Sequence, residues 1–213
     1  YTHGAKDTAF TNGGALRTIE FAKRAATLTG NEIPELWNEV QEKLIKPIVD
    51  PSMNIHLQHS TFNPRRSNTI KQADTVLLNY PMEYPMPKDR AENDLRYYSC
   101  ITDPEGPAMT DSVHAIIAAD LGRHDFSKFL KRSYDTVIGN MFNFNETRVL
   151  RPSAGQQGPA NVFTTAAGGF LQAIGFGATG YRFREDFIHL SPILPSQIED
   201  EPVTRIYFKG LKW

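Results

Sequence analysis

The chain has 213 residues, with 23 Lys and Arg against 24 Asp and Glu, so its net charge is −1. Hydrophobic residues make up 40% and charged residues 22%, as in an ordinary globular domain. There is no basic stripe of the kind that binds nucleic acid, no apolar run as long as the roughly 18–20 residues of a membrane span, and only one cysteine, Cys100. We therefore expect no nucleic-acid partner, no membrane span and no internal disulfide.

The first part of the chain predicts two helices and a short strand. Apolar residues recur at helical spacing over 16–26, and Gly30 follows as a stop. Pro34 suits the first turn of a second helix, which is expected to end near Pro47. The alternating stretch 53–61 then predicts a strand.

Helices dominate the next part of the pattern. Residues 70–80 predict a short buried helix, and the three prolines of 81–87 predict a rigid loop. A polar-faced helix is expected over 89–100, with Leu95 and Tyr98 facing inward.

Two capped helices are expected in the centre of the chain. After a Pro-rich loop over 103–107, Thr110 is predicted to cap a helix that runs to Leu121. Asp125 is predicted to cap the next helix, which Gly139 stops.

The end of the chain changes character. A Gly-rich helix is predicted over 168–177, and after Gly180 the pattern becomes strand-like, at 183–188 and again at 203–208. The connection 141–168 is longer than the roughly 12–15 residues of an ordinary loop, which favours a functional role for it.

Glu146 is the one acid in this long connection and lies among Asn and Phe residues. A carboxylate in such surroundings suits a polar-substrate cleft, although an ordinary loop acid would have the same neighbours. Asn145-Glu146-Thr147 is formally a glycosylation sequon. If Glu146 is catalytic, a glycan would block the cleft, so we predict that Asn145 is not modified.

Residues 71–74 form a second candidate, because Lys and Gln donate hydrogen bonds and Asp accepts them, a combination that suits sugar hydroxyls. A solvated first turn of a helix is the alternative interpretation. The six histidines show no paired metal spacing, and neither a nucleophile elbow nor a phosphate-binding loop occurs. We expect no metal and no organic cofactor.

Four blocks stand out in order along the chain: KQADTVLLNYPM (71–82), DPEGPAMTDSVHAIIAADLG (103–122), FNFNE (142–146) and FTTAAGGFLQAIGFGATGYR (163–182). Together they resemble glycoside hydrolase family 65, and within it most of all the fungal acid trehalases and a related hydroxylysine-linked disaccharide glucosidase. DTAFTN (7–12) is also similar to a stretch of the family.

The resemblance implies a mainly α fold, the second half of an (α/α)6 barrel followed by the start of a C-terminal β-sandwich. The barrel half would cover residues 1–180 and the sandwich 181–213. A full barrel has twelve helices, and the sequence pattern predicts about seven here. We therefore expect an N-terminal remainder of the same enzyme as a partner of this segment.

The resemblance also implies roles for individual residues. Glu146 would be the general base that activates water, and Lys71 and Gln72 would bind the glucose at the cleavage point. Asp74 and Thr165 would support that site. The general acid would be the residue immediately before Tyr1, in the N-terminal remainder.

The implied activity is inverting hydrolysis of an α-glucoside, most of all α,α-trehalose, in a secreted, cell-surface or vacuolar location and with an acid pH optimum. Three alternatives remain open: a glucosidase acting on glucosyl-galactosyl hydroxylysine, a family 65 disaccharide phosphorylase, and a non-catalytic sugar-binding helical protein. Phosphorylases of the family carry a Ser/Thr-rich loop where this chain has GPAMTDS (106–112). The apolar residues there offer few donors to phosphate, which favours hydrolysis.

Overall fold

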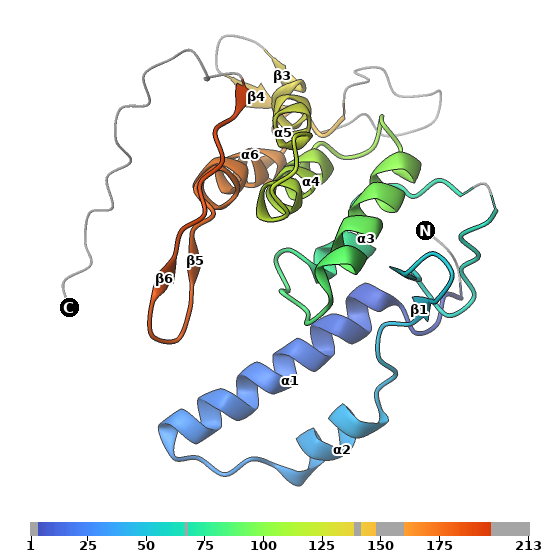
Figure 1. Cartoon of the computed structure of the whole chain (residues 1–213), viewed down its shortest axis with the longest axis vertical. Helices are drawn as coiled ribbons and strands as arrows, with labels where there is room; N and C mark the ends of the chain where they lie inside the picture. Colours follow the sequence, from blue (N-terminus) through green and yellow to red (C-terminus); the bar gives the residue numbers. More distant parts are fainter. Residues whose placement is uncertain (1–3, 67, 139–141, 148–159, 197–213) are drawn as a thin grey trace.

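The computed structural model describes residues 4–66, 68–138, 142–147 and 160–196, and within them the chain is mainly helical with short antiparallel strand pairs (Figure 1). The α-helices are α1 (Ala9–Thr29), α2 (Glu35–Lys43), α3 (Lys88–Ile101), α4 (Met109–Asp120), α5 (Phe126–Tyr134) and α6 (Thr164–Gln172). Helices α4, α5 and α6 gather at one end, and α1 and α2 lie at the other (Figure 1). No helix in these ranges is both long and apolar enough to cross a membrane.

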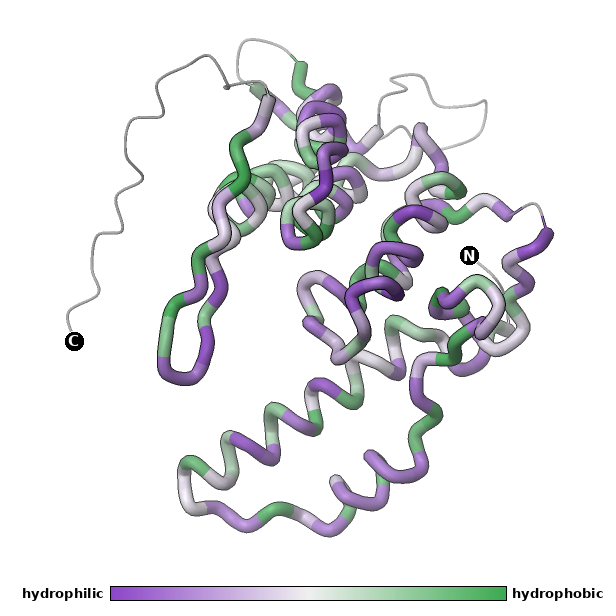
Figure 2. The backbone as a smooth tube through the Cα atoms, viewed as in Figure 1, coloured by the Kyte–Doolittle hydropathy of each residue, from purple (hydrophilic) through white to green (hydrophobic). Residues whose placement is uncertain are grey.

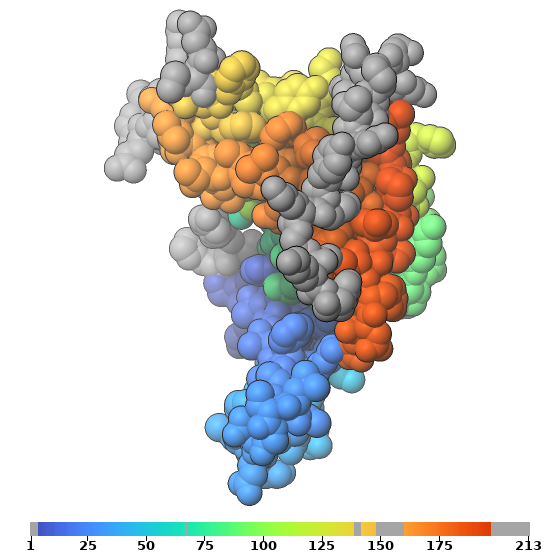
Figure 3. Space-filling model, turned by 90° about the vertical axis from the view of Figure 1, so that its left-hand side faces the viewer, coloured from blue at the N-terminus to red at the C-terminus, as the bar shows by residue number. Residues whose placement is uncertain are grey.

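Helix α1 ends where the sequence predicts. Gly30 has a φ of 69°, in the left-handed region, and its N–H donates to the carbonyl of Thr27 at 3.3 Å. Helix α2 begins at Glu35, directly after Pro34, so the proline precedes the first turn and does not belong to it. Together the two helices protrude from the rest of the molecule, as the blue segment of Figure 3 shows.

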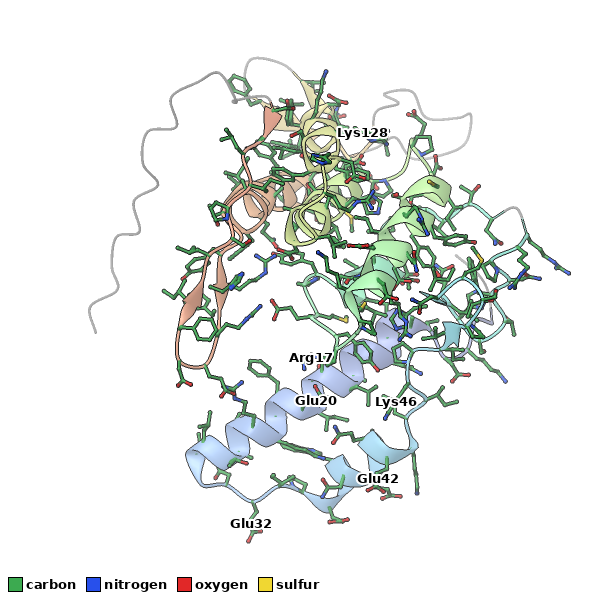
Figure 4. All side chains as sticks on the ribbon, in the orientation of Figure 1. Arg17, Glu20, Glu32, Glu42, Lys46 and Lys128 are labelled. Carbon is green, nitrogen blue, oxygen red and sulfur yellow. The ribbon has the colours of Figure 1, made fainter. Side chains whose placement is uncertain are left out.

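One end of α1 is fixed against the short 3₁₀ helix η1 (Thr75–Leu78). A methyl group at Gly13 would lie 2.3 Å from a methyl of Leu78, so the two elements are in close contact. Arg17 and Glu20 lie on α1 (Figure 4), with a 2.6 Å ion pair between them, and the Arg17 Nε donates to the carbonyl of Met82 at 3.0 Å. Helix α1 therefore packs against η1 and the turn that follows it.

The prediction of a helix over 70–80 is wrong, because only the η1 residues are helical. Ile70 instead pairs with the end of α3: its N–H donates to the carbonyl of Ile101 at 3.0 Å, and its own carbonyl accepts from Asp103 at 2.8 Å. These hydrogen bonds use both backbone polar groups of Ile70, so an α-helix cannot begin at this residue.

The predicted strand over 53–61 is reduced to β2 (Ile55–His56), which pairs antiparallel with β1 (Val49–Asp50). Asp94 of α3 holds β2 in place, because its carboxylate accepts the backbone N–H and lies beside the ring Nδ1 of His56, each at 2.7 Å. The Tyr98 hydroxyl donates to the His56 carbonyl at 2.6 Å. All three residues are buried, so β2 is pinned to α3.

Helix α4 starts earlier than predicted and is not capped by Thr110. Ala108 occupies the N-cap position, and the Thr110 hydroxyl accepts the N–H of Ala73 at 3.1 Å. Helix α5 begins after Asp125 as predicted, although the Asp125 carboxylate accepts from Arg123 and makes no capping hydrogen bond, and the helix ends at Tyr134 rather than near Gly139. The residues beyond it form β3 (Val137–Ile138), which consists of two β-branched residues that suit a strand. Strand β3 pairs antiparallel with β4 (Asn143–Phe144).

The core lies where α3, α4, α5 and η1 meet. Its fully buried large side chains include Leu95 and Tyr98 of α3, as predicted, with Ile116 of α4 and Phe126 of α5. Hydrophobic residues predominate in α6, whereas α1 and α2 alternate between hydrophilic and hydrophobic residues (Figure 2).

At the C-terminal side, α6 continues into the π-helix η2 (Ala173–Ala178), and a hairpin follows, β5 (Arg182–Phe183) with β6 (Ile188–His189). The predicted Gly-rich helix is confirmed, with an earlier start at Thr164. Arg182 holds the hairpin against α4, because its guanidinium donates two hydrogen bonds to the carboxylate of Asp120, at 2.6 and 2.7 Å. The same guanidinium lies over the ring of Tyr80. The strands predicted over 203–208 lie outside the described residues, and the boundary near 180 stays a prediction.

Burial of His114 in α4 is expected to make the fold sensitive to acid. Loss of water around its ring lowers the pKa of His114 from 6.5 to about 4. Because the unfolded chain takes up this proton first, the neutral ring contributes stability above about pH 6.5, and that contribution is lost as the pH falls through about 4. Denaturant unfolding at a series of pH values should show a loss of about 3 kcal/mol from this group.

The variant His114→Gln isolates this contribution because it cannot titrate. It should lose less stability between neutral pH and acid pH than the parent does, whereas the matched change His124→Gln, at an exposed histidine, should leave the pH dependence unchanged. Identical pH dependence in all three proteins would contradict the assignment.

Candidate active site

Two loops lie side by side at the centre of the candidate site. The Ile70–Thr102 bridge sets residues 70–74 beside residues 102–107. Gly106 approaches so closely that a methyl group on it would lie 2.1 Å from the carbonyl oxygen of Lys71. The position of Lys71 is therefore fixed by backbone contacts with the neighbouring loop.

A cavity of about 400 Å³ opens beside the first of these loops, residues 70–74. Three of the predicted sugar-binding residues, Lys71, Gln72 and Asp74, line it together. The remaining walls come from the segment before and around the start of α1, from the residues after β2 and from η1. They include Ala5, Thr8, Phe10, Thr11, Gln58, His59 and Leu77.

Asp74 lies in an unusual electrostatic position for a carboxyl group. Its Oδ2 accepts a hydrogen bond from Gln58 Nε2 at 2.6 Å. Partial burial raises the pKa of Asp74 above its usual value, while the hydrogen bond from Gln58 and the charge of His59 act in the opposite direction. A carboxyl group held in this way can accept a hydrogen bond from a neutral hydroxyl.

Glu146 is anchored to the far side of the same loop. Its carbonyl accepts the N–H of Ala108 at 2.7 Å, and its Oε2 accepts the N–H of Ala160 at 3.2 Å. Glu146 is not among the described residues that line the cavity beside Lys71. The structure thus connects Glu146 with Lys71 through residues 106–108, without showing the two side chains in one cavity.

Thr165 lies in the first turn of α6 and is exposed. That turn is joined to β4, since the N–H of Phe163 donates to the carbonyl of Phe144 at 2.7 Å. Thr165 therefore belongs to the Glu146 side of the site, and it does not line the cavity beside Lys71 in the described part of the chain.

The neighbour of Glu146, Asn145, is only 1% exposed. Both polar atoms of its side-chain amide lack a hydrogen-bond partner among the described residues. A glycan on a side chain this deeply buried would require the segment after β4 to open, and the absence of a modification on Asn145 stays a prediction.

Gln58 and His59 were missed as site residues by the sequence analysis, which placed them only in a predicted strand. Their alternation in HLQH (56–59) is the one local signal, and it does not tell which side chains face a cavity. Their place beside Asp74 comes from the tertiary structure.

A second cavity of about 400 Å³ lies between α3, α4 and α5 and contains none of the predicted sugar-binding residues. Two ion pairs line it, Arg123 with Asp125 at 2.6 Å and Arg132 with Asp111 at 3.0 Å. Over the described ranges, no group of three or more His, Cys, Asp or Glu side chains could hold a metal ion.

The comparison with protein families decides the affiliation of this chain. Residues 37–147, which include the loops described above, match the model of the glycosyl hydrolase family 65 central catalytic domain. The chain belongs to glycosyl hydrolase family 65. The proteins similar to it include a glucosidase, and the resemblance of its four blocks to this family is confirmed.

Two curated relatives are informative about this family 65 chain. It is 34% identical over 213 residues to the protein-glucosylgalactosylhydroxylysine glucosidase of Danio rerio, covering 100% of the chain and 31% of the relative. It is 32% identical over 200 residues to the cell wall acid trehalase of Arthroderma benhamiae, covering 91% of the chain and 19% of the relative. The chain thus spans a third or less of the length of these relatives.

A solved structure described as a kojibiose phosphorylase from the human microbiome shares the fold, with a TM-score of 0.60 at 13% identity. The match covers 89% of this chain and 30% of that one. Because the identity is low, the match supports the fold alone.

Gly106→Ala is expected to disturb the site through Lys71. The new methyl group would meet backbone oxygens of Lys71 and Asp103, at 2.1 and 3.0 Å, so the two loops must separate. Overpacking of this kind costs about 1–3 kcal/mol of stability, and the displaced Lys71 should weaken glucose binding roughly tenfold. Calorimetric titration with glucose measures the affinity.

The matched control is Gly168→Ala in α6, where a methyl group meets no atom within 4 Å. This change should leave glucose affinity unaltered and stabilise the helix slightly. Equal affinities in the two variants would show that the contact between Gly106 and Lys71 does not position the site.

Proposed function

We propose that this protein hydrolyses an α-glucoside and releases glucose from it with inversion at the cleaved carbon. The observation that carries the proposal is the joint placement of Lys71, Gln72 and Asp74 in one cavity, fixed by the loop that also holds Glu146. Inverting hydrolysis needs one carboxylate that activates water and a second group that protonates the leaving oxygen.

In this proposal Glu146 is the general base. A carboxylate is suited to the role because it can take a proton from water while water attacks the sugar from the side opposite the leaving group. Lys71 and Gln72 orient the glucose, which lowers the barrier by holding the reacting atoms in place. Asp74 and Thr165 support that arrangement from the two sides of the loop.

The second carboxylate is assigned by resemblance to the residue immediately before Tyr1. The same resemblance motivates our proposal that residues 1–180 form half of an (α/α)6 barrel and that a β-sandwich begins after it. The likeness to the kojibiose phosphorylase concerns the fold alone, and the name of that protein says nothing about the reaction of this chain.

Two substrates are candidates. The acid trehalase resemblance favours α,α-trehalose, and the similarity to the glucosylgalactosylhydroxylysine glucosidase, which extends over the whole chain, favours the glucosyl-galactosyl unit of hydroxylysine. The cell wall location in the name of the trehalase supports a secreted, cell-surface or vacuolar protein.

Glucose release by the full-length protein should be measured from each disaccharide, with and without phosphate. Hydrolysis that does not depend on phosphate is expected, and the preferred disaccharide identifies the substrate. Phosphate-dependent formation of glucose phosphate would establish a phosphorylase instead, and binding of glucose without turnover of either disaccharide would indicate a non-catalytic sugar-binding protein.

A further inference from the structure

The segment after β2 forms a wall of the sugar cavity, and Gln58 is its contact with Asp74. Both residues line the cavity and both are half-buried. The 2.6 Å hydrogen bond from the Gln58 amide engages Asp74 Oδ2 and joins two segments that lie 16 residues apart in the chain.

The backbone that carries Gln58 is held from several sides. The Gln58 carbonyl accepts the N–H of Ala9, the first residue of α1, at 3.0 Å. On either side of it, the N–H of Leu57 donates to Ile48 at 2.8 Å and that of Ser60 donates to Lys6 at 3.0 Å. The amide of Gln58 therefore extends from a fixed point, which is what a group that orients another side chain requires.

We propose that Gln58 is a positioning residue of the sugar site, whose amide holds one oxygen of Asp74 so that the other accepts a hydroxyl of the bound sugar. This inference rests on the proposed function. The ligand that it implies is a neutral hexose. One hydroxyl of this hexose donates a hydrogen bond to Asp74, and others accept hydrogen bonds from Lys71 and Gln72.

The charges around Asp74 give the inference a pH signature. Burial raises the pKa of Asp74, and the charge of His59, which lies in the same cavity, acts in the opposite direction. Lys71 lines the cavity as well, and burial, with a smaller contribution from Asp74, raises the pKa of Tyr98. The hydrogen bond from Gln58 also lowers the pKa of Asp74. Removal of this bond should therefore raise that pKa, and sugar binding that uses the ionised carboxylate should fade at a higher pH than in the parent.

The test is calorimetric titration of the full-length protein with glucose, from about pH 4 to pH 8. Gln58→Ala should weaken glucose binding roughly tenfold and move the pH midpoint of binding upward. Gln58→Met, which keeps the length of the side chain and removes the amide, should do the same, and it guards against misfolding of the smaller variant. The matched control Gln41→Ala, on α2, should change neither quantity.

A double-mutant cycle shows whether Gln58 acts through Asp74. In the Asp74→Asn background, Gln58→Ala should cause little further loss, because the group that it positions is already altered. Gln58 variants whose affinity and pH midpoint match those of Gln41→Ala would overturn the inference while leaving the proposed function intact. A parent protein that binds no glucose would overturn the proposed function, and the inference with it.

Discussion

Glu146→Gln is expected to lower kcat for glucose release roughly 10²–10⁴-fold, because an amide cannot take the proton of the attacking water. The side chains have the same shape, and the backbone bonds of residue 146 to Ala108 and Ala160 do not depend on its charge. The variant should therefore fold normally and bind glucose with nearly the affinity of the parent. Turnover in the full-length protein and glucose binding by calorimetry measure the two quantities separately.

Glu105→Gln is the matched control, since Glu105 is an exposed glutamate on the neighbouring loop. Its turnover should equal that of the parent. If Glu146→Gln retained turnover within a few-fold of the parent, Glu146 would not be the general base. If it lost glucose binding together with turnover, its role would be in binding the sugar and not in activating water.

Asp94→Ala is expected to cost the fold at least about 1–3 kcal/mol, the usual effect of leaving a buried hydrogen-bonding group without its partner. The change deletes both bonds to His56, each 2.7 Å long, and leaves the His56 N–H and ring without their partner in the core. Burial raises the pKa of Asp94, and its bonds to His56 act in the opposite direction. His56 therefore offsets part of the cost of burying this carboxyl group.

The same substitution should weaken glucose binding, although Asp94 does not line the sugar cavity. Gln58 and His59 lie two and three residues after His56, so loss of the bonds that hold His56 should make this wall of the cavity more mobile. Denaturant unfolding and glucose titration check the two effects, with the exposed Asp186→Ala as control. A loss of stability below about 1 kcal/mol would show that β2 is held by other contacts.

Local patterns predicted much of the helical framework correctly. The apolar spacing before Gly30, the inward Leu95 and Tyr98 of α3, and the Gly-rich α6 with η2 all follow from residues within a few turns of one another. Helical periodicity and a left-handed glycine stop act over such short distances, which is why the sequence is sufficient for them.

The errors occur where distant segments compete for the backbone. Residues 70–74 have a helical pattern, but the backbone of Ile70 is hydrogen-bonded to the end of α3, so no α-helix forms there. Thr110 has the composition of a helix cap, but its hydroxyl accepts a hydrogen bond from Ala73, 37 residues away in the chain. Neither partner can be identified from the local sequence.

The same distinction between local patterns and contacts of distant segments applies to the candidate site. Lys71, Gln72 and Asp74 are close in sequence, so the sequence alone could predict them as one group, and it also determined the mainly helical framework that carries them. Only the tertiary structure placed Gln58 against Asp74 and connected Glu146 to Lys71 through Gly106 and Ala108. The physical reason is that helical periodicity depends on neighbouring residues, whereas a cavity wall depends on hydrogen bonds between segments that the fold brings together.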